Sequence, residues 1–269
     1  MAEKRRILVA TPVDGIPECA MVPYAHARTL ASLKQEMYAD LEILWPDQAY
    51  LAYPADLVRA RSRAIRQAQE HGATHILWLD SDIVPKPGFL GAMLASGHDF
   101  IGCPYPRKRV YWQQVRMMGG DAEEQAYQYS YHFNDGEAQG ATTIQVVNGC
   151  VPVKRLAMGC MLTTMRAINA MTEKYRDELG FTDVVDGRHF DCVAVFQLML
   201  TEWIQFNGRP FRTLLSEDYS FCQRYNEMAG EPGHGLFGPI QMLVSHPADH
   251  VGQHLFRGSP HGLAAAASK

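Results

Sequence analysis

Two aspartates separated by one residue follow an apolar segment in the first third of the chain. From His75 the sequence reads HILWL and continues directly with Asp80, Ser81 and Asp82. Five apolar-leaning residues bounded in this way predict a buried strand, and side chains two positions apart in an extended segment point to the same side. Asp80 and Asp82 are therefore placed to address one cation, and their oxygens suit Mg²⁺ or Mn²⁺. Because these ions also bind phosphate oxygens, the pattern indicates chemistry on a nucleotide-linked substrate.

The same pair has a plainer interpretation, since Asp is common where strands end and turns begin. A second acidic pair, Glu217 and Asp218, precedes a segment of helical composition, YSFCQRYNEMAG. A carboxylate at a helix N-terminus is held in its charged form by the local dipole, so this pair is a candidate general base. The alternative is an acidic helix cap with no catalytic duty.

Two arginines lie on the helix expected just before the aspartate strand. Arg59 and Arg61 are candidates to neutralise the carboxylates or a bound diphosphate. Residues two positions apart on a helix do not share a face, so we expect only one of them to have that role. The alternative is that both are solvated charges on the helix surface.

The elements that position these residues alternate along the first part of the chain. The sequence predicts strands at 6–11, 41–45, 75–79 and 99–103, and helices at 25–38, 56–70 and 88–95. Further on it predicts a strand at 157–163, helices at 165–178 and from Glu217, and a last strand at 238–244. Alternation of this kind predicts an α/β fold with a mainly parallel sheet and helices on both faces. Such sheets bind ligands at the carboxyl ends of their strands.

Composition indicates an ordinary globular protein of 269 residues, with 47% hydrophobic and 20% charged residues. The formal charge of −4 gives no overall attraction to nucleic acid or to an anionic membrane. We expect one domain over 1–258, with 104–150 as an excursion or flexible flap and 259–269 as a tail. No signal peptide or membrane span is recognisable, so we expect a cytoplasmic protein whose six scattered cysteines are free thiols.

Four segments together resemble the GT-A class of nucleotide-sugar glycosyltransferases, particularly its small bacterial and phage-type members. They read VATPVDG, LVRARSRAIRQAQEHGATHILWLDSD, LAMGCMLTTMRAI and LLSEDYSFCQRYNEMAG, and they stand in the order found in that class. A later segment, HVGQHLFRG, resembles the one that supplies a histidine to the metal. The resemblance spans most of residues 6–258, but 104–150 matches nothing, and Ser62 stands where the family often has Asn.

The resemblance implies a GT-A-like fold and a metal-dependent transfer of a sugar from a nucleoside-diphosphate sugar to an acceptor hydroxyl. In this family Asp82 would bind Mn²⁺ or Mg²⁺ directly, and Asp80 would contact the metal or the ribose. His250 would complete the metal site, with His246 and His254 as rivals.

The same resemblance assigns the remaining roles. Thr11 and Pro12 would receive the nucleoside, and Arg61, with Arg59 as second candidate, would contact the donor. Asp218, beside Glu217, would be the base of an inverting enzyme; in a retaining enzyme it need not be.

The acceptor stays open between a glycan and DNA, because phage-type relatives suggest a modified nucleobase. The compact basic and aromatic patch Arg107-Lys108-Arg109 with Tyr111-Trp112 is a candidate site for a phosphate-bearing acceptor, DNA or RNA. A solvated loop is the plainer interpretation of that patch.

Three other functions fit parts of the pattern. A haloacid-dehalogenase-like phosphatase would use Asp80 as nucleophile, but it usually places its late acidic pair on strand ends. A sugar nucleotidyltransferase would need a Gly-rich basic loop, which VATPVDGIPECAM lacks. A non-catalytic nucleotide-sugar-binding module would explain the first acidic pair but not the second.

Overall fold

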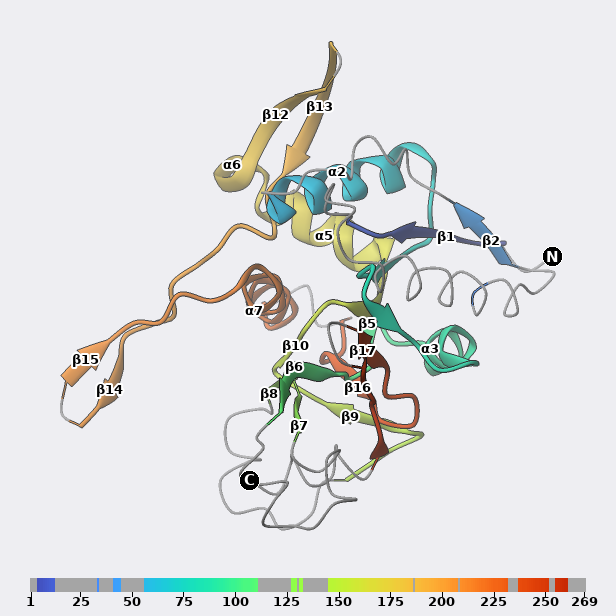
Figure 1. Ribbon diagram of the computed structural model, residues 1–269. Helices are drawn as coiled ribbons and strands as arrows, with labels where there is room; N and C mark the ends of the chain where they lie inside the picture. Colours follow the sequence, from blue (N-terminus) through green and yellow to red (C-terminus); the bar gives the residue numbers. More distant parts are fainter. Residues whose placement is uncertain are drawn as a thin grey trace.

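A computed structural model describes residues 4–12, 33, 41–44, 56–110, 127–129, 131–132, 145–185, 187–207, 209–231, 237–251 and 255–260. At its centre lies a seven-stranded sheet (Figure 1). In spatial order the strands are β2 (Leu41–Leu44), β1 (Arg5–Ala10), β3 (His75–Leu79), β11 (Cys160–Thr164), β5 (Phe100–Gly102), β16 (Gln241–Leu243) and β9 (Cys150–Pro152). Strands β2, β1, β3, β5 and β16 run in one direction, while β11 and β9 run in the other.

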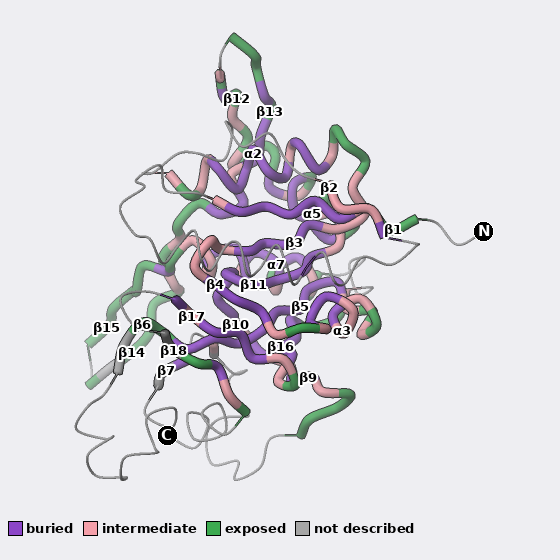
Figure 2. The backbone as a smooth tube through the Cα atoms, turned by 45° about the vertical axis from the view of Figure 1, so that its right-hand side comes forward, coloured by how far each residue is buried: buried purple, intermediate pink, exposed green. Residues whose placement is uncertain are grey.

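Helices cover both faces of this sheet because alternate strand residues point to opposite sides. The helices are α2 (Leu57–Glu70), α3 (Phe89–Ser96), α5 (Met165–Lys174), α6 (Arg176–Leu179) and α7 (Glu217–Ala229). From β3, Ile76 and Trp78 join a core with α2, α5 and α7, whereas Leu77 and Leu79 join a second core with α3. The two cores share the buried strands at the centre of Figure 2. The expected α/β fold, with a mainly parallel sheet flanked by helices on both faces, is confirmed.

Helix α2 follows its sequence signals closely. The Asp56 side chain accepts a hydrogen bond from the Arg59 amide at 3.0 Å and so caps the first turn. The helix ends before Gly72, whose φ of +60° lies in the left-handed region that glycine tolerates best. Both the expected cap and the expected stop are confirmed.

Smaller sheets and hairpins surround the central sheet. They comprise β4 (Ile83–Val84) with β17 (Asp249–Val251) and β18 (Leu255–Phe256); β6 (Pro106–Val110) with β7 (Tyr127–Tyr129); β8 (Tyr131–His132) with β10 (Arg155–Leu156); β12 (Gly180–Val185) with β13 (Arg188–Val193); and β14 (Ile204–Phe206) with β15 (Arg209–Phe211). Two of these hairpins project from the body, β12–β13 and β14–β15 (Figure 1). Sequence analysis missed both, although Asp186-Gly187 and Asn207-Gly208 are typical hairpin turns.

Other sequence predictions differ in detail from the structure. The helix expected at 165–178 is divided into α5 and α6, and the solvated loop expected at Arg107-Lys108-Arg109 is strand β6. Most of the expected helix at 25–38, of the 104–150 excursion and of the 259–269 tail lies outside the described residues. The cysteines that are described, all but Cys19, are free and buried as expected. None of the described helices is both long enough and apolar enough to cross a membrane.

A buried ion pair joins the β12–β13 hairpin to α2. The Arg63 guanidinium donates to Asp183, and their side chains are only 2% and 6% exposed. Arg59 also approaches Asp183, with its Nη1 3.9 Å from Oδ1. Burial alone would raise the pKa of Asp183, but the hydrogen bond and charge of Arg63 hold it below its usual value.

Replacing Asp183 with alanine should lower the free energy of unfolding by about 3 kcal/mol, because it strands a buried arginine charge. A carboxyl with a depressed folded-state pKa stabilises the protein fully above its unfolded pKa of about 4. That contribution is lost as pH falls through the folded value. Urea denaturation between acidic and neutral pH would measure both effects. The exposed Asp191→Ala on β13 is the control, and an equal loss there would remove the special role of Asp183.

Candidate active site

The first acidic pair stands where β3 ends at the carboxyl edge of the sheet. The Asp80 amide donates to the carbonyl of Gly159 at 2.9 Å, and the Ile83 amide donates to the carbonyl of Asp80 at 3.1 Å. This tight turn sends the chain into β4, which pairs with β17 so that His250 lies opposite Ile83. The Val251 amide also donates to the Asp82 carbonyl at 2.8 Å. Backbone pairing thus brings His250 beside Asp82.

Arg61 joins the two acidic pairs. Its side chain is 2% exposed, and its guanidinium donates to Asp218 across the interior. The same guanidinium lies 3.6 Å from the Asp80 carboxylate and 3.8 Å from that of Glu217. The alternative of a solvated helix charge is therefore excluded for Arg61. Arg59 is 41% exposed and pairs with Asp56 and Asp183 instead, so only one of the two arginines reaches the site, as the helix geometry predicted.

Helix α7 presents the second acidic pair as expected. Ser216 caps the helix, its hydroxyl accepting from the Tyr219 amide at 3.4 Å, and Glu217 and Asp218 occupy the first turn. Asp218 Oδ1 accepts from Arg61, while Oδ2 accepts from the Met158 amide at 3.1 Å. The Asp218 carboxylate is thereby held in one orientation, with 16% of its side chain exposed.

The pKa of Asp80 is raised to about 6, although 34% of the side chain remains exposed. Burial of the carboxyl in the site is the main cause, and the neighbouring charges of Asp218 and Asp82 add to it. The positive charge of Arg61 opposes the shift and limits it. Burial would also lower the pKa of Arg61, but Asp218 and Asp80 raise it, so this arginine stays charged.

Asp82 has a different environment from Asp80. The Lys108 ammonium on β6 donates to Asp82 Oδ2, and His250 Nε2 lies 3.5 Å from the same oxygen. Burial would raise the pKa of Asp82, but hydrogen bonds and charge from His250 and Lys108 hold it below its usual value. His250 Nδ1 lies 2.8 Å from the Pro106 carbonyl, an acceptor that requires the proton on Nδ1. With Nδ1 bound to that carbonyl, Nε2 is the ring nitrogen that faces Asp82.

This arrangement bears on the expected metal. Among the described residues no three His, Cys, Asp or Glu side chains form a group that could hold an ion. Two donors are nevertheless adjacent, the Asp82 carboxylate and His250 Nε2, and the latter has the backbone partner that metal-binding histidines usually have. Mg²⁺ or Mn²⁺ at a nucleotide site takes most of its remaining oxygens from phosphate and water. The donor set thus fits a cation that arrives with a phosphate-bearing ligand.

Tyr105 completes the floor of the site and was missed by sequence analysis. Its hydroxyl accepts from the Gly159 amide at 2.9 Å, and its ring meets the His250 ring edge-on, with centroids 5.3 Å apart. A Cβ at Gly159 would lie 2.6 Å from the Tyr105 hydroxyl and 3.0 Å from Asp80 Oδ2, so only glycine fits there. Lys108 was also missed as a partner of Asp82, because no local pattern joins β6 to the aspartate turn.

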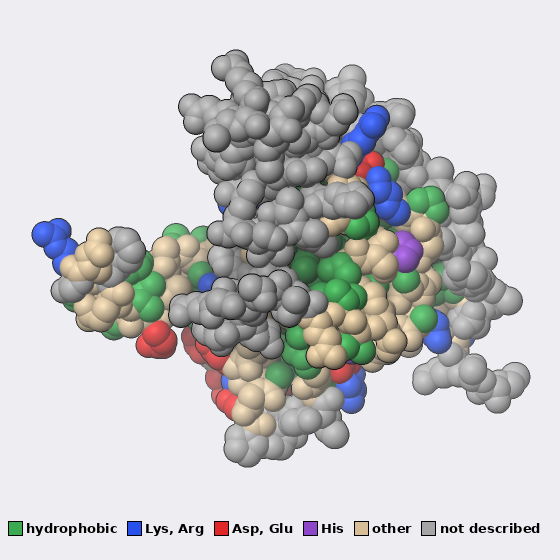
Figure 3. Space-filling model, turned by 90° about the horizontal axis from the view of Figure 1, so that it is seen from below, with side chains coloured by type: hydrophobic (Ala, Val, Ile, Leu, Met, Phe, Trp, Pro, Cys, Tyr) green, Lys and Arg blue, Asp and Glu red, His purple; other side chains and the backbone are tan. Residues whose placement is uncertain are grey.

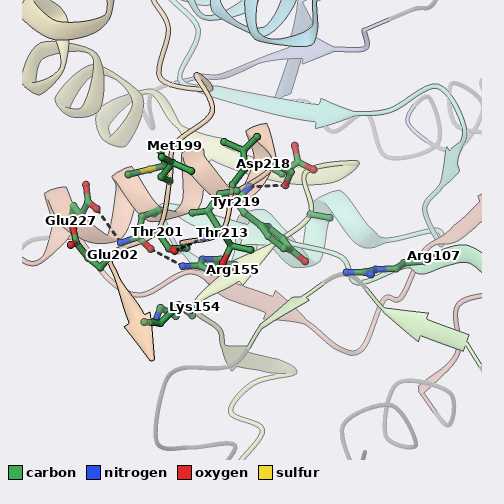
Figure 4. Close-up of a pocket in the computed structure, with 17 residues that line it drawn as sticks. Arg107, Lys154, Arg155, Met199, Thr201, Glu202, Thr213, Asp218, Tyr219 and Glu227 are labelled. Atoms are coloured by element: carbon green, nitrogen blue, oxygen red, sulfur yellow. Dashed lines mark hydrogen bonds between the residues drawn. The ribbon is translucent and has the colours of Figure 1, made fainter. Parts of the chain in front are cut away.

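A cleft of about 830 Å³ opens beside the second acidic pair (Figure 4). Asp218 and Tyr219 of α7 line it, together with residues of the segment that carries β14 and β15. The other lining residues are Arg107, Lys154, Arg155, Ala157, Met199, Leu200, Thr201, Glu202, Ile204, Thr213, Leu214, Leu215, Ser216, Gln223 and Glu227. The lining mixes apolar and polar side chains, with acidic and basic residues in equal number.

The remaining candidate residues from the sequence are Thr11, Pro12, His246 and His254. Ala10 pairs with Trp78, so Thr11 and Pro12 follow at the same sheet edge as Asp80. Thr11 is 2% exposed, and within the described part its hydroxyl has no hydrogen-bond partner. His246 hydrogen-bonds to Ser245 at 3.0 Å, with its Nε2 near Gly88 at the start of α3. His254 lies outside the described residues.

Comparisons with known proteins add little to this geometry. No model of a known protein family matches the sequence, and no curated protein matches it. Among solved structures the chain is similar to the crystal structure of A197 from STIV, with 14% identity and a TM-score of 0.45. The match covers 92% of this chain and 85% of that one. This TM-score is too low to carry an argument, so the fold and the site rest on the strand order and the contacts described above.

Replacing Arg61 with methionine should destabilise the protein more at pH 8 than at pH 5. Without the guanidinium charge the pKa of Asp80 rises further above its unfolded value. A carboxyl with a raised folded-state pKa stabilises the fold at low pH and loses that contribution as pH rises through the folded pKa. Melting temperatures across this range would measure the effect, with the exposed Arg59→Met as control. A deficit independent of pH would show that Arg61 contributes packing alone.

Proposed function

We propose that this protein is a metal-dependent glycosyltransferase that moves a sugar from a nucleoside-diphosphate sugar to an acceptor hydroxyl. One observation carries the proposal: the carboxylates of two distant acidic pairs meet at one buried arginine, beside a cleft. Asp80 reaches Arg61 from the end of β3, and Asp218 reaches it from the start of α7. This juxtaposition supports a site with a donor-binding side at Asp80 and an acceptor-binding side at Asp218, which meet at Arg61.

The donor side is the carboxyl edge of β1 and β3. Thr11 and Pro12 end one strand and Asp80 the next, so a nucleoside bound there lies within reach of both. Asp82 and His250 are the candidate ligands of Mn²⁺ or Mg²⁺. A cation held there supplies positive charge for the diphosphate that leaves during transfer.

The acceptor side is the cleft that Asp218 lines. The Asp218 oxygens are oriented by Arg61 and by the Met158 amide, and a carboxylate has a further lone pair available on Oδ2. Asp218 lies in the first turn of α7, beside the cleft. Asp218 is therefore suited to take the proton of an acceptor hydroxyl bound in the cleft. The Glu217 side chain is 25% exposed and lies 3.8 Å from Arg61, so its carboxylate also faces the charge of this guanidinium.

The donor and acceptor surfaces also separate this proposal from its rivals. The late acidic pair opens helix α7 rather than ending a strand, unlike the arrangement typical of haloacid-dehalogenase-like phosphatases. A nucleotide-sugar-binding module without catalysis would need Asp218 only as the partner of Arg61 and would not explain why this carboxylate also lines the cleft. The ion pair of Asp80 with the buried Arg61 favours a positioning duty over that of a nucleophile.

The Asp82→Ala variant should lose metal-dependent nucleotide binding, because it removes one of the two adjacent donors. Thermal unfolding with UDP, GDP, CDP or dTDP, with and without Mn²⁺, would measure this, since a ligand of the folded state raises the melting temperature. The unaltered protein should show a metal-dependent rise with one nucleotide. The matched control is the exposed Asp191→Ala on the β12–β13 hairpin. A variant that retains the full rise would remove Asp82 from the metal site.

The Asp218→Asn variant should keep the nucleotide-induced rise but lose transfer, by about 10²- to 10⁴-fold, because an amide accepts no proton. Single-turnover assays would measure the rate, with a sugar donor that carries the nucleotide found to raise the melting temperature. Glu217→Gln tests which acid is the base and should lose much less. Undiminished transfer by the asparagine variant would end the role of Asp218 as base.

A further inference from the structure

A long hairpin carries most of the exposed large apolar side chains. We call residues 197–215, which include β14 and β15, the arm; it stands away from the body in Figure 1. Of the ten large hydrophobic residues that are exposed in the described part, six belong to it. They are Leu198, Leu200, Trp203, Ile204, Phe211 and Leu214, exposed by 42%, 46%, 65%, 43%, 38% and 61%.

The arm is an ordered ladder rather than a loose loop. The Thr201 amide donates to the Thr213 carbonyl, and the Leu215 amide donates to the Met199 carbonyl, both at 2.9 Å. At its base Arg224 Nη1 donates to the Val195 and Gln197 carbonyls, which anchors the arm to α7. The arm is thus a defined projection of the fold.

Both faces of the hairpin carry exposed apolar side chains at its outer end. Ile204 pairs directly with Phe211 across the strands, so these two side chains share a face. Trp203 precedes Ile204 and points to the other face, where the Arg212 guanidinium lies 5.6 Å from its ring centre. An isolated two-stranded hairpin is only marginally stable in water. Apolar side chains on both faces indicate that the outer end of the arm packs against something else.

The charge of the outer end restricts the partner. Residues 203–212 read WIQFNGRPFR, with two arginines and no acid. The only acidic residue of the arm is Glu202, which lines the cleft. Figure 3 shows the arm at the left, with hydrophobic side chains along it and Lys or Arg atoms at its end. A complementary partner is therefore both negatively charged and apolar.

We propose that the outer end of the arm docks onto an anionic lipid surface. Trp and Arg suit the headgroup region, where an amphipathic ring and a guanidinium both find partners, while Ile204 and Phe211 reach the acyl boundary. A second copy fits less well, because pairing two arms would place their arginines together. Nucleic acid fits less well too, because the aliphatic side chains of the arm have nothing to stack on.

The inference goes beyond the proposed glycosyltransferase activity and has a consequence for it. Leu200 and Leu214 belong to the arm and also line the cleft that Asp218 reaches. An arm seated on lipid would bring the open side of the cleft to acceptors at that surface. Lipid binding itself requires neither metal nor nucleotide, so either proposal can fail without the other.

The test is cosedimentation of the protein with vesicles of phosphatidylcholine, alone or mixed with phosphatidylglycerol. The unaltered protein should bind the mixed vesicles, and added salt should weaken binding by screening the arginines. The Trp203→Ser/Phe211→Ser variant should bind about tenfold more weakly, because it loses apolar burial. Arg209→Gln should weaken binding to the mixed vesicles and leave binding to vesicles of phosphatidylcholine alone unchanged.

The matched control is Leu57→Ser/Val184→Ser, which removes two equally exposed apolar residues outside the arm. It should bind as the unaltered protein does. Melting temperatures of all variants would show whether they are folded. Arg209→Gln changes an exposed side chain, so it tests the proposal even if the double variant does not fold.

Three results would overturn the proposal. The first is the absence of vesicle binding, or equal binding by the arm variant. The second is a dimer by light scattering that becomes a monomer in the arm variant, which would make a second copy the partner. The third is arm-dependent retention of a single-stranded oligonucleotide without any vesicle binding.

Discussion

The buried charge of Arg61 holds the candidate site together. A guanidinium at 2% exposure is costly to bury unless carboxylates surround it, and here three of them do. Those carboxylates come from β3 and α7, while the arginine comes from α2, so one side chain fixes the relation of three elements. Because the planar guanidinium offers several donors in a fixed geometry, a lysine would not meet all three partners equally well.

The two aspartates of the turn differ because of what faces them. Asp80 faces Arg61 and Asp218, and burial with two neighbouring carboxylates raises its pKa, whereas Asp82 faces Lys108 and His250, which lower its pKa. Two identical side chains two residues apart thus have opposite tendencies to hold a proton. This separation of roles comes from the turn after β3, which places them against different elements.

Local sequence signals predicted much of this structure. The apolar run before Asp80, the Asp56 cap of α2 and the acidic opening of α7 are each encoded in a few adjacent residues, and each stands as expected. The placement of Arg61 followed in part, since helix periodicity separates it from Arg59. What failed depends on distant pairing: Lys108 and Tyr105 reach the site only because of how their segment packs against β17 and β11. The arm had a local signal, Asn207-Gly208, but its projection from the body has none.

The contact between Lys108 and Asp82 has a thermodynamic consequence. The Lys108 ammonium already neutralises the Asp82 carboxylate from within the chain, so a cation that binds Asp82 competes with an internal one. Its apparent affinity is reduced by the strength of that contact, and by reciprocity its binding displaces the Lys108 ammonium from the Asp82 carboxylate. A cation bound at the sheet edge and the Lys108 ammonium therefore compete for the same Asp82 carboxylate.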